Sequence, residues 1–409
     1  AASAQMPRAL RREAVNENAE AVAAMCEAAQ GRWGKLLGVR AQVNSRLRLT
    51  EFTRIVDSTT DFLAFVEGAS ARKSLGLRST LQSQAKAFLG AYHATSLAKV
   101  RSLLEQEQWT TAEVAPVFQA AVDKLLLGKA DGASATAEDS SPSKAAGGGA
   151  LVVGSARVPC VNSALMLVSI LGEYVELSSK LPMLATETVH RVAEILKLFN
   201  SRTCQLVLGA GALQVSGLRS ITAKVLALAD QGVTLFLLLL PSLKTVLAAH
   251  VPAERHRLVL GELDKVAADF TAHREQIHLK LVTILKERML VHLRRLPVLR
   301  EQWSNNAETV AGPSEFATAL VKEASVLQKV LSQLIQPDEL KALLLQVLGL
   351  FDKMLPEAVE RGAGAGTAQL SADLEHVLAH LEGVRAAAAA DDDALAQLKL
   401  CAAAVKTEA

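Results

Sequence analysis

The chain has 409 residues, of which half are hydrophobic and only 4% aromatic, and its formal net charge is +2. Alanine and leucine, both strong helix formers, supply most of the apolar residues, whereas the β-branched and aromatic runs typical of strands are scarce. This composition predicts an all-α protein with a sizeable core. The small net charge, without a basic face interleaved with aromatics, argues against nucleic acid as a partner.

The first 127 residues carry helical patterns. An alanine-rich helix is expected over 13–30, ending at the turn GRWGK, and two further helices are expected over about 52–68 and 77–108. The sequence TTAE at 110–113 has the spacing of a capping box, in which a threonine hydroxyl and a glutamate carboxylate satisfy free donors at a helix start. We therefore predict that the next helix begins there and that residues 1–127 form one helical bundle.

The stretch 128–150 is poor in bulky apolar residues and rich in glycine, alanine, serine and aspartate. Such a composition predicts a flexible low-complexity linker between two domains. After it, a short hairpin is expected over 151–159 and a helix over 164–177, ending before Pro182.

A long helix is expected from near Glu187 through Leu228 into the apolar run VTLFLLLLP. That run ends at Pro241 and falls well short of the roughly 20 residues of a membrane-spanning helix, so we predict a buried core helix. Within the long helix, one ridge is almost bare of large side chains and would let another helix approach closely. It consists of Gln205, Gly209, Ala212 and Ser216.

Four more helices are expected, over 258–295, 316–334, 337–355 and 370–384. These patterns place a central bundle at 151–304 and a C-terminal bundle at 313–385. The remainder, 386–409, is rich in alanine and aspartate and is predicted to be a low-complexity tail.

Motifs for catalysis or cofactor binding are incomplete in this sequence. The pair Gly209 and Gly211 suggests a dinucleotide fingerprint, but Gln214 stands where the third small residue is needed. His376 and His380 have a metal-binding spacing, but no third ligand follows at a recognisable distance. We predict no catalytic residues, no cofactor and no metal, with an unrecognised enzyme site near Arg202 as an alternative.

One charge cluster stands out between 280 and 300, where basic residues meet little acid. A basic amphipathic helix can rest on anionic lipid or on an acidic partner helix, and it can also be an ordinary solvated face. The candidate interaction residues are Lys286, Arg288, Arg294, Arg295 and Arg300.

The stretch FNSRTCQLVLGAGALQV at 199–215, with its continuation to 229, resembles the vacuolar protein sorting-associated protein 54 family. Weaker similarity extends over about 80–355. The residues that carry the resemblance, and that we expect to pack in the core, are Phe199, Asn200, Ser201, Arg202, Gln205, Gly209, Gly211 and Gln214.

The resemblance implies a non-catalytic subunit of the Golgi-associated retrograde protein (GARP) complex, which tethers endosome-derived vesicles at the trans-Golgi network. It implies elongated stacked helical bundles of the tethering-complex type, and coiled-coil assembly in a part of the family N-terminal to this chain. The implied partners are other GARP subunits, SNARE proteins and small GTPases. The implied location is the cytoplasmic face of the trans-Golgi network and endosomes, in peripheral contact with membrane. The alternative is a generic α-helical scaffold of another trafficking complex.

Overall fold

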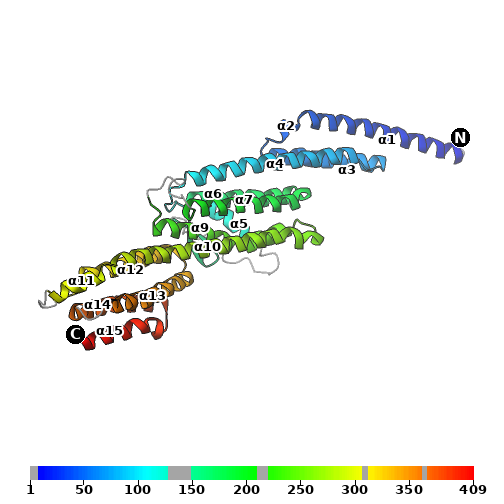
Figure 1. Cartoon of the computed structure of the whole chain (residues 1–409). Coiled ribbons are helices and arrows are strands. Elements are labelled where there is room, and N and C mark those ends of the chain that lie inside the picture. The colour runs from blue at the N-terminus through cyan, green and yellow to red at the C-terminus, as the bar shows by residue number, and fades with distance from the viewer. Residues whose placement is uncertain (1–7, 128–148, 210–219, 306–311, 362–365) are drawn as a thin grey trace. The chain divides into compact units, whose positions relative to one another are not determined.

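The computed structural model describes residues 8–127, 149–209, 220–305, 312–361 and 366–409 (Figure 1). Most of these residues are helical, and the only sheet among them is a two-stranded hairpin, so the prediction of an all-α fold is confirmed. The long helices are α1 (Arg8–Val39), α3 (Leu49–Ser70), α4 (Leu75–Glu105), α6 (Asn162–Lys180), α7 (Ala185–Val207), α9 (Ala223–Ala248), α10 (His256–Leu293), α12 (Glu315–Leu334), α13 (Pro337–Glu360) and α14 (Thr367–Ala388). The shorter elements are α2 (Ala41–Asn44), α5 (Pro116–Leu127), β1 (Ala150–Val153), β2 (Ala156–Pro159), α11 (Leu296–Asn305) and α15 (Ala396–Glu408).

The chain forms two compact units whose segments interleave along the sequence. Unit 1 comprises Ala1–Ser102, Ser169–Leu198 and Leu243–Leu263, and unit 2 comprises Leu103–Val168, Phe199–Ser242 and Asp264–Ala409. Helices α4, α6, α7, α9 and α10 therefore contribute residues to both units. The expected succession of separate bundles along the chain stays a prediction, and most of the expected linker lies outside the described residues.

Aromatic stacking holds α1, α3 and α4 together in unit 1. Phe52 and Phe88 stack with ring centroids 4.3 Å apart, and Trp33 stacks on Phe62 at 5.3 Å. The indole of Trp33 also donates a hydrogen bond to Thr59 (3.1 Å). The expected end of the first helix at GRWGK is wrong, because α1 continues through it to Val39. The packing of Trp33 offsets the helix propensity lost at the neighbouring glycines, about 1 kcal/mol each.

A buried polar cluster joins α4 to α6 and α7 within unit 1. His93 is 4% exposed, and its two ring nitrogens contact the Tyr174 hydroxyl (2.6 Å) and the Glu194 carboxylate (3.1 Å). Beside it, the Tyr92 hydroxyl donates to Glu173 (2.6 Å). Burial lowers the pKa of His93 against the opposing pull of Glu194, so the fold favours its neutral form.

The capping box expected at 110–113 is wrong. These residues are not helical, and the Ala112 N–H instead donates to the Cys160 carbonyl (2.8 Å). Helix α5 begins at Pro116, whose missing N–H is harmless in a first turn and whose ring disfavours helical backbone in the residue before it.

The expected hairpin is confirmed as β1 and β2, paired antiparallel with Ala150 opposite Pro159. Gly154 starts the two-residue turn with φ +62°, a conformation that favours glycine at this position of a hairpin. Gln119 links α5 to strand β1, because its side chain exchanges two hydrogen bonds of 2.9 Å with the backbone of Val152.

The expected continuous helix from Glu187 to the apolar run is wrong. Helix α7 ends at Val207, where the N–H groups of Leu208 and Gly209 both donate to the Cys204 carbonyl. A Cβ on Gly209 would lie 2.6 Å from the Gln205 carbonyl oxygen, so a side chain there would press on the helix end. Of the remaining small-ridge and signature residues, Gly211, Ala212, Gln214 and Ser216 lie outside the described residues.

Helix α9 is the apolar core helix that the sequence predicts, and it is longer than expected. It passes through Pro241 to Ala248, and every residue from 225 to 236 is buried. Of the described helices, only α9 is long and apolar enough to cross a membrane by length and composition. Its most apolar window is nevertheless 78% buried inside the protein, as in the core helix of a folded domain.

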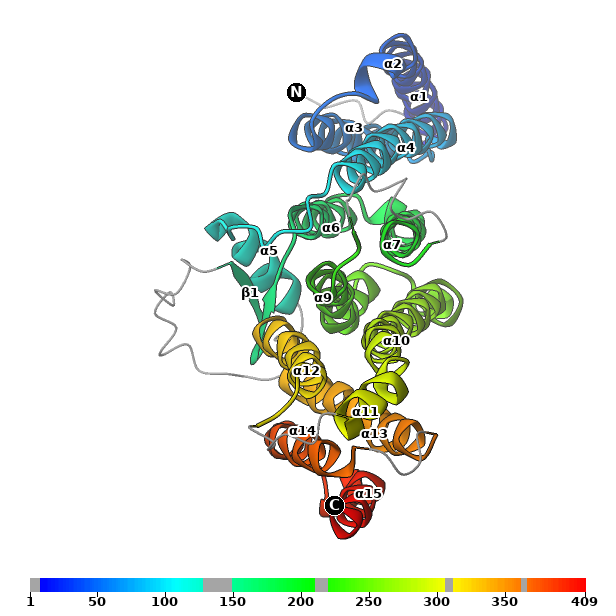
Figure 2. The ribbon, with the colours of Figure 1, turned by 60° about the vertical axis from the view of Figure 1, so that its left-hand side comes forward.

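The last part of unit 2 is a group of packed helices, in which α13, α14 and α15 lie side by side (Figure 2). Helix α13 does not end near Leu355 as expected but passes Pro356 to Glu360. The stretch 386–409, expected as a low-complexity tail, contains the short 3-10 helix Asp392–Leu395 and helix α15, in which Leu395 and Leu398 respectively are fully buried. The alanine-rich composition misled the prediction, since alanine is also the best helix former.

Polar contacts fix α15 to both of its neighbours. The Leu398 N–H donates to the Asp352 carboxylate of α13 (2.9 Å), and Lys406 pairs with Glu375 of α14 (2.7 Å). Lys399 pairs with the carboxylate of Glu382, also on α14 (2.8 Å). Helix α15 is therefore an integral part of unit 2.

Replacing Leu398 by alanine should destabilise the protein by about 2–4 kcal/mol, because the truncation leaves a cavity against α13 and α14. Leu400 is the matched control: it lies on the same helix and is 72% exposed, so Leu400→Ala should change stability by no more than about 0.5 kcal/mol. Urea unfolding followed by circular dichroism measures both. Equal effects of the two substitutions would contradict the docking of α15.

Candidate functional site

A single carboxylate lies inside the apolar helix α9. Asp230 is 0% exposed in unit 2, surrounded along the helix by leucine, alanine and valine. An ionised group at such a position is strongly unfavourable unless it is paired and hydrogen-bonded. Its oxygens are in fact satisfied by the His278 Nε2 (2.8 Å) and by the amide of Gln231 (3.1 Å).

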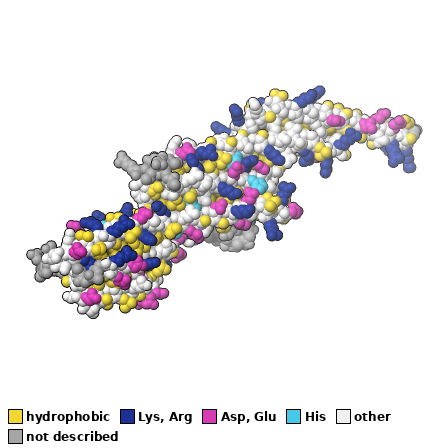
Figure 3. Space-filling model, in the orientation of Figure 1, with side chains coloured by type: hydrophobic (Ala, Val, Ile, Leu, Met, Phe, Trp, Pro, Cys, Tyr) yellow, Lys and Arg dark blue, Asp and Glu magenta, His cyan; other side chains and the backbone are white. Residues whose placement is uncertain are grey.

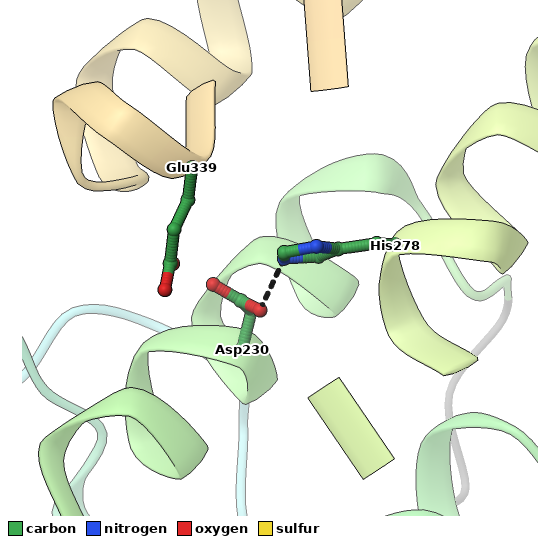
Figure 4. Close-up of side chains that lie close together, drawn as sticks. All are labelled: Asp230, His278 and Glu339. Carbon is green, nitrogen blue, oxygen red and sulfur yellow. Dashed lines mark hydrogen bonds and ion pairs between the residues drawn. The ribbon is translucent and has the colours of Figure 1, made fainter. Parts of the chain in front are cut away.

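Two other helices complete the site, as Figure 4 shows: His278 comes from α10 and Glu339 from α13, and both point towards Asp230. We call these three residues the Asp230 cluster. Arg274 precedes His278 by one helical turn, so the two lie on the same face of α10, and its guanidinium donates to Glu339. Glu339 is in the first turn of α13, where the helix dipole favours a negative charge.

The electrostatics of the cluster reflect two carboxylates in a poorly solvated site. Burial, followed by the neighbouring charge of Asp230, raises the pKa of Glu339, while Arg274 and His278 oppose the rise. One ligand atom from each member of the cluster lies within 4.8 Å of the others. Among the described residues this is the one group of three or more histidine, cysteine and acidic side chains with metal-site spacing.

A second set of contacts ties the cluster to the hairpin. The amide of Gln336, at the start of α13, donates to the Gln231 side chain (3.2 Å) and to the Arg157 carbonyl of β2 (2.8 Å). Residues from α9, α10, α13 and β2 thus form one polar network in unit 2, which runs from buried Asp230 to the surface at Arg157. The network can hold four chain segments in a fixed register.

His273 makes a separate link between α10 and the signature stretch. Its Nδ1 donates to the Asn200 side-chain oxygen (2.7 Å), and the buried Nε2 has no hydrogen-bond partner among the described residues. His273 is 4% exposed, and burial lowers its pKa from the ordinary 6.5 to about 4, against a weaker opposing effect of Asp230. The imidazole is therefore neutral in the folded protein at pH 7.

The described signature residues cluster in the core of unit 2 or beside it. Phe199 is 1% exposed and begins an edge-to-face chain with Phe236 (4.9 Å) and Phe270 (6.0 Å from Phe236). Arg202 pairs with Glu105 (2.6 Å) and also donates to Gln205 (2.9 Å), while Ser201 is exposed. Phe199 and Asn200 thus pack in the core, but the expected core position is wrong for Ser201 and Gln205, which are exposed, and Arg202 is only partly buried.

The predicted basic stretch is divided by the structure. Lys286, Arg294 and Arg295 are exposed, and Arg288 is exposed but paired with Glu323 (2.7 Å). Arg300 belongs to a different helix, α11, and is 3% exposed, with its guanidinium donating to the Val359 carbonyl (2.8 Å). The turn before α11 directs Arg300 inward, so it is not part of the surface. On the face shown in Figure 3, basic side chains are interspersed with acidic ones.

The histidine pair with metal-binding spacing, His376 and His380, is not part of the Asp230 cluster. His380 contacts the Ser325 hydroxyl (3.2 Å) and links α14 to α12, with His376 one turn away. Asp230 and Glu339 were missed because they lie far apart in the sequence and on separate helices. The available signal was an aspartate within an otherwise apolar helix, which requires a buried partner.

Comparisons with known proteins all point to one family. A family model for Vps54-like protein matches residues 156–288. The chain is 35% identical to "Vacuolar protein sorting-associated protein 54, chloroplastic" of Arabidopsis thaliana, over 84% of this chain and 40% of that protein. It is 35% identical to vacuolar protein sorting-associated protein 54 of Rattus norvegicus over 59% of this chain, and 30% identical to that of Drosophila melanogaster over 61%, in each case over 25% of the relative. The chain thus spans two fifths or less of the length of these relatives. No solved structure matches it.

The burial of neutral His273 predicts a specific loss of stability in acid. Because its pKa is lower in the folded than in the unfolded chain, protons bind preferentially to the unfolded chain as the pH falls from 6.5 towards 4. The wild type should lose about 3 kcal/mol more stability over this range than His273→Gln, whose amide can still donate to Asn200. Urea unfolding at a series of pH values measures the difference. Parallel pH profiles would contradict the assignment.

Proposed function

Because the chain belongs to the vacuolar protein sorting-associated protein 54 family, we propose that it forms part of a non-catalytic subunit of the GARP vesicle-tethering complex. In this proposal the complex acts in retrograde transport from endosomes to the trans-Golgi network. Similarity over 84% of the chain to a member of the family is the observation that carries it.

The structure supports a scaffold in physical terms. Long helices pack around the apolar helix α9, and charged side chains link helices to one another, such as buried Asp230 with His278 and half-buried Arg274 with Glu339. A tether needs rigid segments and several weak contacts, because linked contacts bind together far more tightly than each does alone. The proposed contacts are with the other GARP subunits, SNARE proteins and small GTPases.

For the basic stretch we propose peripheral membrane contact on the cytoplasmic face of endosomes or the trans-Golgi network. Its exposed members are Lys286, Arg294 and Arg295. Each basic side chain near an anionic membrane contributes about 1 kcal/mol of attraction, which salt screens over a distance of about 10 Å. Three exposed cations that form no ion pair with the described residues give weak binding, which is appropriate to one contact among several.

Affinity purification of the tagged full-length protein tests the assignment to GARP. We expect the other GARP subunits to be recovered in proportion to the tagged protein, as for a stable hetero-oligomer. A different stable set of partners, recovered repeatedly without them, would favour the alternative of a scaffold for another trafficking complex.

Charge reversal tests the membrane contact. The double variant Arg294→Glu/Arg295→Glu should bind phosphatidylserine-containing vesicles at least about 30-fold more weakly than wild type, since two attractive contributions of about 1 kcal/mol are lost and two repelled charges are added. Vesicle sedimentation at two salt concentrations measures the binding, which should also weaken with salt.

The matched control is Arg255→Glu/Arg257→Glu, which changes the net charge equally at two exposed positions near the start of α10. This control should bind nearly as well as wild type. An equal loss in both double variants would show that only net charge matters and would exclude a contact specific to the basic stretch.

A further inference from the structure

The Asp230 cluster combines ligand types that divalent transition metals accept. Two carboxylates and one imidazole, from α9, α10 and α13, place three ligand atoms within 4.8 Å of one another. In a zinc site with bonds of 2.0–2.2 Å the ligand atoms lie roughly 3.3–3.5 Å apart. Small rotations of the side chains drawn in Figure 4 would therefore close a coordination shell.

Unsatisfied oxygens at the same place are an independent sign that the network lacks a partner. Glu339 Oε2 is buried and accepts no hydrogen bond from the described residues, although Oε1 accepts from Arg274. Thr234 follows Asp230 by one helical turn on the same face of α9 and is 3% exposed, and its hydroxyl also has no partner among the described residues. A buried carboxylate oxygen without a donor is unfavourable, and a cation would satisfy it.

We propose that Asp230, His278 and Glu339 bind a zinc ion in the interior of unit 2. The ligands are one oxygen of each carboxylate and the His278 Nε2, and water completes a tetrahedral shell. Arg274 and Gln231 keep their hydrogen bonds to Glu339 and Asp230 and so orient the two carboxylates from the outer shell.

Binding changes one bond of the present network. The His278 Nε2–H now donates to Asp230 (2.8 Å); on binding, zinc takes the place of this proton at Nε2, and the neutral imidazole carries its one proton on Nδ1 instead. The site can be reached from water, because the side chains of His278 and Glu339 are 16% and 21% exposed while Asp230 lies at its base with 0%.

The effect of the ion is structural. It replaces a hydrogen bond between α9 and α10 by coordinate bonds that also include α13, and so it joins these two consecutive helices to a third that is distant in the sequence. A ligand that binds only the folded state stabilises it by mass action, so the melting temperature should rise with zinc concentration.

Isothermal titration of the EDTA-treated full chain with zinc chloride tests the proposal, together with thermal unfolding at each zinc concentration. We expect one zinc per chain with a Kd on the order of micromolar or tighter. Loss of a ligand in His278→Gln or Glu339→Gln should weaken binding at least about tenfold and reduce the thermal shift at each zinc concentration accordingly. Asp230→Asn should have the same effect. If this variant does not fold because Asp230 is fully buried, the variants of the partly exposed His278 and Glu339 still test the proposal.

The matched control is His376→Gln/His380→Gln, which removes the pair of histidines with metal-binding spacing on α14 and should bind zinc as wild type does. Absence of zinc binding by the wild type would overturn the proposal and leave the cluster as an ion-pair network. Binding that persists unchanged in both His278→Gln and Glu339→Gln would overturn it too, because the ion would then occupy another site.

Discussion

A helix that is apolar on every side is stable in water only if other segments surround it, and α9 imposes this condition on unit 2. From Val225 to Phe236 every residue of α9 is buried. The aromatic chain from Phe199 of α7 through Phe236 to Phe270 of α10 shows how the neighbouring helices cover it. Burial of side chains of this size contributes about 2–3 kcal/mol each, and the requirement for cover explains why segments distant in the sequence meet here.

Because α9 is buried, Asp230 restricts which segments can pack against this helix. A carboxylate inside an apolar helix would oppose folding, unless partners arrive from helices that pack against it. His278 provides the direct partner, and Arg274, Gln231, Gln336 and Glu339 extend the network to α13 and to the hairpin. Breaking such a network is costly, since each lost partner leaves a buried polar group unpaired. The apolar core therefore supplies much of the driving force, and the polar network restricts the arrangements that are acceptable.

Features that depend on local sequence pattern could be predicted from the sequence alone. The all-α class, the hairpin at 151–159 and the core position of the apolar run follow from composition and periodicity. Helix ends were less predictable, because tertiary packing overrides local signals: α1 continues past two glycines where Trp33 stacks, and α9 continues through Pro241.

The Asp230 cluster was not predictable from spacing, since its three residues are brought together only by the packing of α9, α10 and α13. Arg300 shows the opposite error. It appeared to continue a basic surface in the sequence, but the start of a new helix at Leu296 turned it towards the Val359 carbonyl. A continuous charge pattern in sequence is a continuous surface only as long as the helix itself continues.

The packing of α15 against α13 and α14 affects the abundance of this protein in a cell. Cleavage between α14 and α15 would remove the cover that Leu395, Leu398 and Val405 provide and would bare apolar side chains of α13 and α14. Exposed patches of this kind attract chaperones and proteases, which respond to small losses of stability with several-fold changes in abundance. A truncated chain would then be depleted by degradation, even if every surface needed for binding partners were intact.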